Sequence, residues 1–285
     1  VGLPSDMTLT AEAGLCSATV SWEVVTSTDN CEVESLTSDH QSGETFPVGT
    51  TEVTYETTDI HGNSTSGGFF ITITDDENPE FVDLPERVTV PNEPGICSAA
   101  VSWDAPQAAD NCGISGITSS HGSGDQFPVG ETVVTLTATD IHGNQSTAQF
   151  IIEVEDVEAP QILDIPVDIV VENDGGQCGA IVSWTPPTSE DNCAIDTFDS
   201  SHSSGDFFAV GTTEVTFIAV DIHGNETSGS FTVVVTDEEA PVILDVPADI
   251  TVSNDSGLCG ASVTWQSPTA TDNCSIDTFD SSHSS

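Results

Sequence analysis

The sequence predicts an all-β chain of tandem immunoglobulin-like β-sandwich modules with an 81-residue period. Two observations predict it. Every cysteine, tryptophan and histidine recurs at intervals of 81 residues, and each copy contains short runs that alternate apolar and polar residues between turn residues. About seven such runs in about 80 residues are typical of an immunoglobulin-like sandwich. We find no stretch with the i, i+3, i+4, i+7 apolar spacing of an amphipathic helix.

The cysteines define the period most clearly. Cys16 and Cys97 are 81 residues apart, as are Cys31 and Cys112. The 285 residues therefore contain about 3.5 periods, which is typical of a tandem array. The fourth copy stops half-way, so we expect the chain to be an excerpt of a longer array. The predicted repeats are residues 1–78, 79–159 and 160–240, with the first half of a fourth at 241–285.

The second copy illustrates each expected element in order. Residues 81–84 and 87–91 are predicted to form a first strand in two parts, and residues 99–103 alternate towards Trp103. Residues 114–119 form the third predicted strand, followed by a glycine-containing turn at 121–124. Residues 132–138 and 150–154 are the last two strands, joined by a loop at 140–144. The tryptophan is the expected anchor of the core.

The charge of the chain is strongly one-sided. Asp and Glu number 48, and Arg87 is the single basic residue apart from histidine, so the net charge is −47. A chain without a basic surface cannot neutralise phosphates, which excludes binding to nucleic acid or to anionic lipid. Since no apolar run approaches about 18 residues, we expect no membrane insertion. We interpret the bulk acidity as an aid to solubility in a salty or calcium-rich medium.

The repeated motifs resemble a known module. In the third copy they are D-V-E-A-P at 156–160, P-V-D-I-V-V at 166–171, C-G-A-I-V-S-W at 178–184, D-N-C at 191–193 and V-D-I-H-G-N at 220–225. This order is similar to that of the hyalin repeat (HYR), found in extracellular adhesive and matrix proteins. Animal members often carry cysteine where this chain has Leu84, Ile165 and Val246. We therefore expect a closer resemblance to bacterial secreted members.

The eight cysteines imply an oxidising, extracellular compartment. The C-x14-C spacing favours a bond within each copy, with a loop of about 15 residues that contributes roughly 3 kcal/mol. The first cysteine of each pair precedes the second strand and the other follows it, so a bond within the copy requires the connecting loop to fold back. If the loop does not fold back, a link from one copy to the next is the alternative. A zinc site is a weaker alternative, because close C-x2-C pairs are absent. The expected bonds are Cys16–Cys31, Cys97–Cys112, Cys178–Cys193 and Cys259–Cys274.

Acidic residues recur where one copy passes into the next. The linker D-x-E-x-P lies at the pole where the next copy presents two loops that contain Asp and Asn. Convergent carboxylates suit Ca²⁺, which takes 6 to 8 oxygen ligands. The alternative is that these residues only form Asx turns or are solvated. The hypothesised ligands are Asp75, Glu77, Asp110 and Asp140 at the first junction, Asp156, Glu158, Asp191 and Asp221 at the second, and Asp237, Glu239 and Asp272 at the third.

The remaining motifs point away from catalysis. The histidines lie in glycine-containing turns without a nucleophile at a plausible spacing, so we interpret them as structural, assign no catalytic residue and expect no enzyme. Asn63, Asn144 and Asn225 begin N-x-[ST] sequons on a loop that we expect to be exposed and usable if the source glycosylates.

These inferences lead to one functional expectation. We expect a secreted or cell-surface protein that forms an adhesive or structural rod, stalk or filament, stiffened by Ca²⁺ at its junctions. Its expected partners are further copies of the array, with lateral association into fibres, and a cell-surface or glycan partner. The alternatives are an array of carbohydrate- or protein-binding modules and a non-catalytic region of a larger secreted protein.

Overall fold

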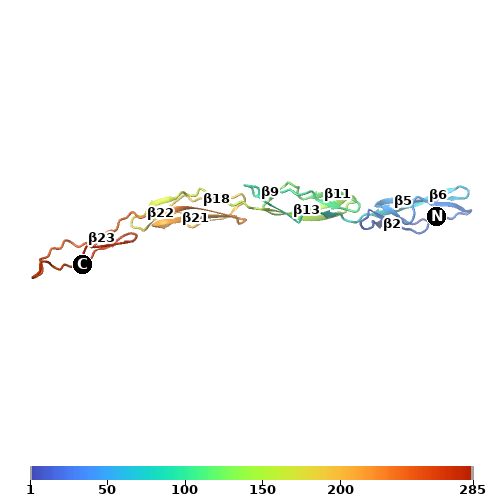
Figure 1. Cartoon of the computed structure of the whole chain (residues 1–285). Helices are drawn as coiled ribbons and strands as arrows, with labels where there is room; N and C mark the ends of the chain where they lie inside the picture. The colour runs from blue at the N-terminus through green and yellow to red at the C-terminus, as the bar shows by residue number, and fades with distance from the viewer. Residues whose placement is uncertain (1, 284–285) are drawn as a thin grey trace. The chain divides into compact units, whose positions relative to one another are not determined.

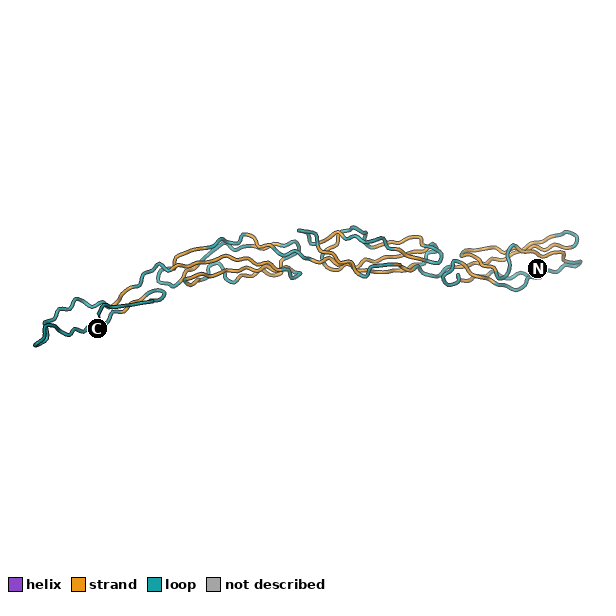
Figure 2. The backbone as a smooth tube through the Cα atoms, viewed as in Figure 1, coloured by secondary structure: helices purple, strands orange, loops and turns teal. Residues whose placement is uncertain are grey.

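A computed structural model of the chain describes residues 2–283. It consists of strands and turns, without a helix in those residues, as Figure 2 shows. The described residues accordingly include no helix able to cross a membrane. The chain divides into two compact units, and each is described by itself. The first holds residues up to Glu93 together with Ser98–Glu155, and the second holds Pro94–Cys97 together with residues from Asp156 onward.

The first unit contains two β-sandwich repeats (Figure 1). The strands of the first are β1 (Met7–Thr10), β2 (Ser17–Val20), β3 (Val33–Ser38), β4 (Glu44–Pro47), β5 (Gly49–Asp59) and β6 (Ser64–Thr74). Those of the second are β7 (Glu80–Val82), β8 (Arg87–Pro91), β9 (Ser98–Ala100), β10 (Gln107–Ala109), β11 (Ile114–Ser119), β12 (Gln126–Pro128), β13 (Gly130–Asp140) and β14 (Gln145–Glu155). In the second repeat a four-stranded sheet, β8-β14-β13-β11, accompanies the two-stranded pairs β7-β10 and β9-β12. The first repeat has the sheet β1-β6-β5-β3 and the pair β2-β4.

The second unit repeats this topology. Its strands are β15 (Gln161–Leu163), β16 (Ile169–Glu172), β17 (Gly179–Ile181), β18 (Thr188–Glu190), β19 (Ile195–Ser200), β20 (Phe207–Ala209), β21 (Gly211–Asp221), β22 (Glu226–Thr236), β23 (Val242–Leu244) and β24 (Thr269–Thr271). The sheet β16-β22-β21-β19 accompanies β15-β18 and β17-β20. The fourth copy contributes the pair β23-β24, and its apolar residues, such as Ile243, remain exposed. Closed cores are therefore found in the first three repeats.

Alternation along the strands produces each core. In the second repeat Val134, Leu136, Phe150 and Ile152 are almost fully buried, because every second residue of β13 and β14 faces inward. Trp103 packs edge-on against Phe150 with ring centroids 5.4 Å apart. The fold class and the split first strand are confirmed by the strands β7 and β8 and their sheets. Trp103 is half-buried and packs against the core, whereas Trp22 is buried in the core of the first repeat.

The break in the first strand has a local cause that the sequence analysis missed. Asp83, Asp164 and Asp245 adopt positive φ angles of 54°, 59° and 58° at the same position of three successive copies. Aspartate tolerates this left-handed conformation better than most residues. The turn lets β7 pair with β10 on one side of the sandwich while β8 runs parallel to β14 on the other.

Candidate functional site: the repeat junctions

The first junction consists of the linker at residues 75–77 and two loops of the second repeat, at residues 110–113 and 140–144. In the first loop Asp110 Oδ1 accepts hydrogen bonds from the backbone N–H groups of Cys112 (2.9 Å) and Gly113 (3.0 Å). In the second, Asp140 Oδ1 accepts from the N–H groups of His142 and Asn144, both at 2.8 Å. The Asx turns that the sequence suggested as an alternative are therefore present, and they fix both carboxylates.

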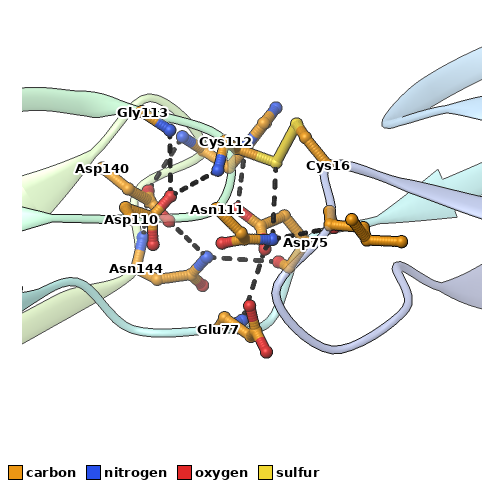
Figure 3. Close-up of polar contacts among 11 residues, drawn as sticks. Cys16, Asp75, Glu77, Asp110, Asn111, Cys112, Gly113, Asp140 and Asn144 are labelled. Atoms are coloured by element: carbon orange, nitrogen blue, oxygen red, sulfur yellow. Dashed lines mark hydrogen bonds and ion pairs between the residues drawn. A yellow bond between two sulfur atoms is a disulfide. The ribbon is translucent and has the colours of Figure 1, made fainter.

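The linker carboxylate of Asp75 lies between these loops, and its side chain is fully buried. Its Oδ2 lies 3.0 Å from His142 Nδ1, and its Oδ1 accepts a hydrogen bond from Asn111 Nδ2 at 3.2 Å. Asn144 Nδ2 donates both to the Asp75 carbonyl oxygen (3.2 Å) and to Asp140 Oδ2 (2.7 Å). Carboxylate oxygens of Asp75, Asp110 and Asp140 consequently lie within 4.8 Å of one another. Figure 3 shows these three residues with their hydrogen-bond partners.

Glu77 does not join this group. Both of its carboxylate oxygens accept the backbone N–H of Gly14 in the preceding repeat, at 3.0 and 3.1 Å. Figure 3 shows Glu77 away from the carboxylates of Asp110 and Asp140. Its role in this structure is to fasten the linker to a turn of the preceding repeat.

The disulfides connect successive copies. Cys16 bonds Cys112, and the two residues are 96 positions apart. Cys97–Cys193 and Cys178–Cys274 repeat this bond, while Cys31 and Cys259 are free and exposed. The expected pairing within each copy is therefore wrong, and the alternative link from copy to copy is confirmed. The physical reason is that the two cysteines of one copy belong to different junctions: Cys112 bonds Cys16 of the preceding repeat, whereas Cys97 bonds Cys193 of the following one.

The second and third junctions repeat the first with small differences. At the second, carboxylate oxygens of Asp156, Asp191 and Asp221 lie within 4.8 Å of one another, and His223 Nδ1 lies 3.0 Å from Asp156 Oδ2. At the third, Asp237 and Asp272 approach each other and Cys274. The linker glutamates again bind glycine N–H groups: Glu158 accepts from Gly95 at 2.7 Å and Glu239 from Gly176 at 2.8 Å.

Burial and hydrogen bonding oppose each other at Asp140, which is 1% exposed. Burial raises its pKa, but the hydrogen bonds from the Asn144 side chain and from the N–H groups of Asn144 and His142 outweigh burial and bring the pKa below its ordinary value. The pKa of Asp221 is lowered in the same way, with Asn225 as the main donor. Both carboxylates are therefore held as anions in the interior of the junction.

Two oxygens of the first junction have no hydrogen-bond partner in the part of the chain that the structure describes. They are Asp110 Oδ2 and Asn111 Oδ1, and both are buried. The third junction has the same pair, Asp272 Oδ2 and Asn273 Oδ1. A buried oxygen acceptor without a donor is costly, so these atoms are suited to bind a cation or a water molecule.

Sequence reasoning placed asparagines in the junction loops but missed the junction role of two histidines. His142 and His223 bind linker aspartates rather than only forming turns; the available signal was their constant place two residues after a loop aspartate. The expectation of exposed sequon asparagines is correct for Asn63, but wrong for Asn144 and Asn225, which are half-buried. In both, Nδ2 makes two hydrogen bonds, one of which an attached glycan would replace.

Comparison with known families agrees with this repeated geometry. The model of the HYR domain matches residues 1–73, 74–154 and 155–235. The chain belongs to the HYR domain family. This HYR chain is 39% identical over 272 residues to hyalin of Lytechinus variegatus, which covers 92% of the chain and 51% of that protein. It is 34% identical over 284 residues to hyalin of Strongylocentrotus purpuratus, which covers 96% of the chain and 24% of that protein.

The HYR chain thus spans about half or less of the length of these two relatives. The expected closeness to bacterial members is not supported, because the match to a serine-rich adhesin for platelets from Staphylococcus aureus is 29% identical over 122 residues. Among solved structures, protocadherin gamma B2 extracellular cadherin domains 3-6 match 86% of the chain and 75% of their own, at 17% identity and a TM-score of 0.32. A match this distant supports no statement about function.

Proposed function

We propose that this HYR chain works outside the cell as an adhesive or structural repeat array whose junctions are held by Ca²⁺ as well as by disulfides. The family membership and the likeness to the hyalins support an extracellular repeat protein. Disulfides between successive copies support an oxidising compartment. We include in the proposal the rod, stalk or filament form, association with further copies, and a cell-surface or glycan partner.

The observation that carries the calcium proposal is the group of buried carboxylates at the first junction. Asp75, Asp110 and Asp140 lie within ligand reach of one another, and His142 is the titratable base in contact with Asp75. Buried anions need a compensating charge, and one imidazole against three carboxylates supplies too little. A divalent cation would supply the missing charge.

The available donor atoms fit Ca²⁺ chemically. Carboxylate and amide oxygens are the ligands that this ion prefers, and it tolerates water in the remaining positions. At the first junction the proposed ligands are Asp75, Asp110, Asp140 and the buried Oδ1 of Asn111. At the second they are Asp156, Asp191 and Asp221, and at the third Asp237, Asp272 and the Oδ1 of Asn273. We leave Glu77, Glu158 and Glu239 out of the ligand set, because each binds a glycine N–H group.

Calorimetric titration of the whole chain with Ca²⁺, together with its thermal midpoint in millimolar calcium and in chelator, tests the proposal. The double variant Asp110→Asn, Asp191→Asn removes two proposed ligand charges while an amide oxygen can still accept the N–H bonds of each loop. We expect it to bind fewer ions and to lose the stabilisation by calcium at two junctions.

A matched control is Asp29→Asn, because Asp29 occupies the corresponding loop of the first repeat and no group of three possible ligands includes it among the described residues. This control and Glu77→Ala should retain calcium binding. A calcium response that is absent from the parent chain, or unchanged in the double variant, would contradict the proposal.

A further inference from the structure

The three disulfide loops overlap along the sequence. Each bond joins residues 96 positions apart, although the repeat period is 81 residues. Each loop therefore begins before the preceding loop has closed, and neighbouring loops share residues 97–112 and 178–193. Every residue between Cys16 and Cys274 consequently lies inside at least one disulfide loop.

This overlap creates a short covalent route through the molecule. The route crosses from Cys16 to Cys112, returns along the backbone to Cys97, crosses to Cys193, returns to Cys178 and crosses to Cys274. It follows the backbone only over the two shared segments, whereas the chain between the same end points runs through every repeat. We propose that this route carries tension applied to the ends of the chain, so that the array between Cys16 and Cys274 acts as an inextensible tether whose four-stranded sheets in the second and third repeats are shielded from force.

The difference in reach is large. A fully extended chain spans at most about 3.5 Å per residue. The maximum length of the short route is therefore about 105 Å for its two backbone segments. To this are added three disulfides, each with a Cα–Cα distance of 4.6–4.7 Å. The whole backbone between Cys16 and Cys274 would reach about 900 Å. Complete unfolding of the repeats could not lengthen the disulfide-bonded chain between Cys16 and Cys274 beyond the shorter limit.

The strands divide into two groups with respect to this route. In the second repeat the route follows residues 97–112, which include β9 and β10. The four-stranded sheet β8-β14-β13-β11, with its 11-residue strands β13 and β14, lies off it. In the third repeat the route follows β17 and β18, and the sheet β16-β22-β21-β19 lies off it. The longest strand pairings of the second and third repeats thus stabilise the fold without carrying the applied force.

The segment on the route is itself held by local contacts. Val101 is 1% exposed, its N–H donates to the Asp125 carbonyl oxygen at 3.1 Å, and its carbonyl oxygen accepts from Gly124 at 2.8 Å. The N–H of Trp103 donates to Ser123 Oγ at 2.9 Å, and Ser123 Oγ donates back to the Trp103 carbonyl oxygen at 2.8 Å. If force did extract this segment, its length would limit the gain to about 50 Å per repeat, against about 280 Å for a whole repeat.

This inference goes beyond the proposed calcium function and does not depend on it. It uses only the covalent bonds, so it holds in chelator. Reduction removes the tether: each disulfide accepts two electrons and two protons from a dithiol reagent, which becomes a cyclic disulfide, and the whole backbone then lies under load.

Single-molecule force spectroscopy of the full chain, pulled from both ends in chelator, tests the proposal. The parent for all variants is Cys31→Ser, Cys259→Ser, which removes the two free thiols that could exchange with the disulfides. Without reductant we expect the part of this parent between Cys16 and Cys274 to extend to the short limit only, with the two end segments adding about 90 Å. With a dithiol we expect it to gain about 228 residues of contour length, or roughly 800 Å.

Removing single disulfides gives unequal lengths that only the overlapping route predicts. Loss of the middle bond, in Cys97→Ser with Cys193→Ser, leaves the route through residues 112–178 and should add about 36 residues, or roughly 126 Å. Loss of the first bond, in Cys16→Ser with Cys112→Ser, exposes residues 16–97 and should add about 66 residues, or roughly 230 Å.

These lengths are read at full extension, so a variant that folds poorly still tests the proposal. Equal gains from the two variants would overturn it. So would a parent that reaches about 800 Å without reductant, which is the limit if its remaining bonds close within single copies. A lack of calcium binding would leave both lengths unchanged, so failure of the calcium proposal can be told apart.

Discussion

Replacing Asn144 by alanine tests how much one side chain contributes to the first junction. Its Nδ2 group donates to Asp140 Oδ2 at 2.7 Å and to the Asp75 carbonyl oxygen at 3.2 Å. A hydrogen bond to a charged group contributes about 1.5–3 kcal/mol and one to a neutral group about 0.5–1.5 kcal/mol. Because Asp140 is 1% exposed, loss of the donor leaves a buried carboxylate oxygen poorly solvated. We therefore expect Asn144→Ala to lower the free energy of unfolding by about 2–4 kcal/mol.

Calorimetry in chelator measures this loss without a contribution from calcium. For a domain of 60–100 residues each kcal/mol moves the thermal midpoint by about 4–8 °C, so the midpoint of the transition that includes the second repeat should fall by about 8–32 °C. The matched control is Asn63→Ala, since Asn63 makes the corresponding bond to Asp59 at 2.8 Å but is exposed. Its effect should be small. Equal shifts in the two variants would refute the claim that linker contact and burial make the junction bond strong.

Single features of the fold give three further predictions. Because the pKa of Asp140 is lowered in the folded chain, its stabilising contribution should be complete above the ordinary carboxyl pKa of about 3.9 and should be lost as the pH falls through the lowered value. Measuring the thermal midpoint at decreasing pH in chelator should show this loss. In Asp140→Asn the midpoint should depend less on pH in this acidic range. Gly68→Ala should lower the free energy of unfolding, measured by chemical denaturation, by about 1–3 kcal/mol, because the added Cβ would lie 2.7 Å from a backbone carbonyl oxygen of β5. Gly116→Ala should leave this free energy nearly unchanged, because there is open space around its Cβ. When the purified, folded chain is glycosylated in vitro, mass spectrometry should find more glycan at Asn63 than at Asn144, and equal occupancy would contradict the closed junction.

Much of the fold could be predicted because its causes are local. Alternating residues in β13 and β14 face the core, and the turn residues between strands mark where each run ends. The short strands β10 and β12, of three residues each, were not predicted separately, because a run of that length carries too little alternation to stand out from a loop. The left-handed Asp83 was missed for a related reason, since aspartate is common in ordinary turns as well.

The candidate site could be predicted only in part, because it depends on contacts between copies. The sequence placed Asp75, Asp110 and Asp140 at one pole, and the structure brings their carboxylates together. It could not tell that Glu77 would bind the Gly14 N–H, because that contact depends on the preceding repeat. The disulfides illustrate the same limit: sequence proximity favoured a bond within each copy, whereas in the fold the two cysteines of one copy belong to different junctions.

Digestion with trypsin at the single arginine tests the central claim, that covalent bonds join one copy to the next. Arg87 lies between Cys16 and Cys112, so cleavage after it divides the chain into residues 1–87 and 88–285. With free thiols blocked and the chain partly denatured, the cleaved protein should remain one species until reductant is added, and Cys16→Ser should separate without reductant. If the unreduced parent chain separated into the two fragments, the Cys16–Cys112 bond, and with it the connected junction, would be contradicted.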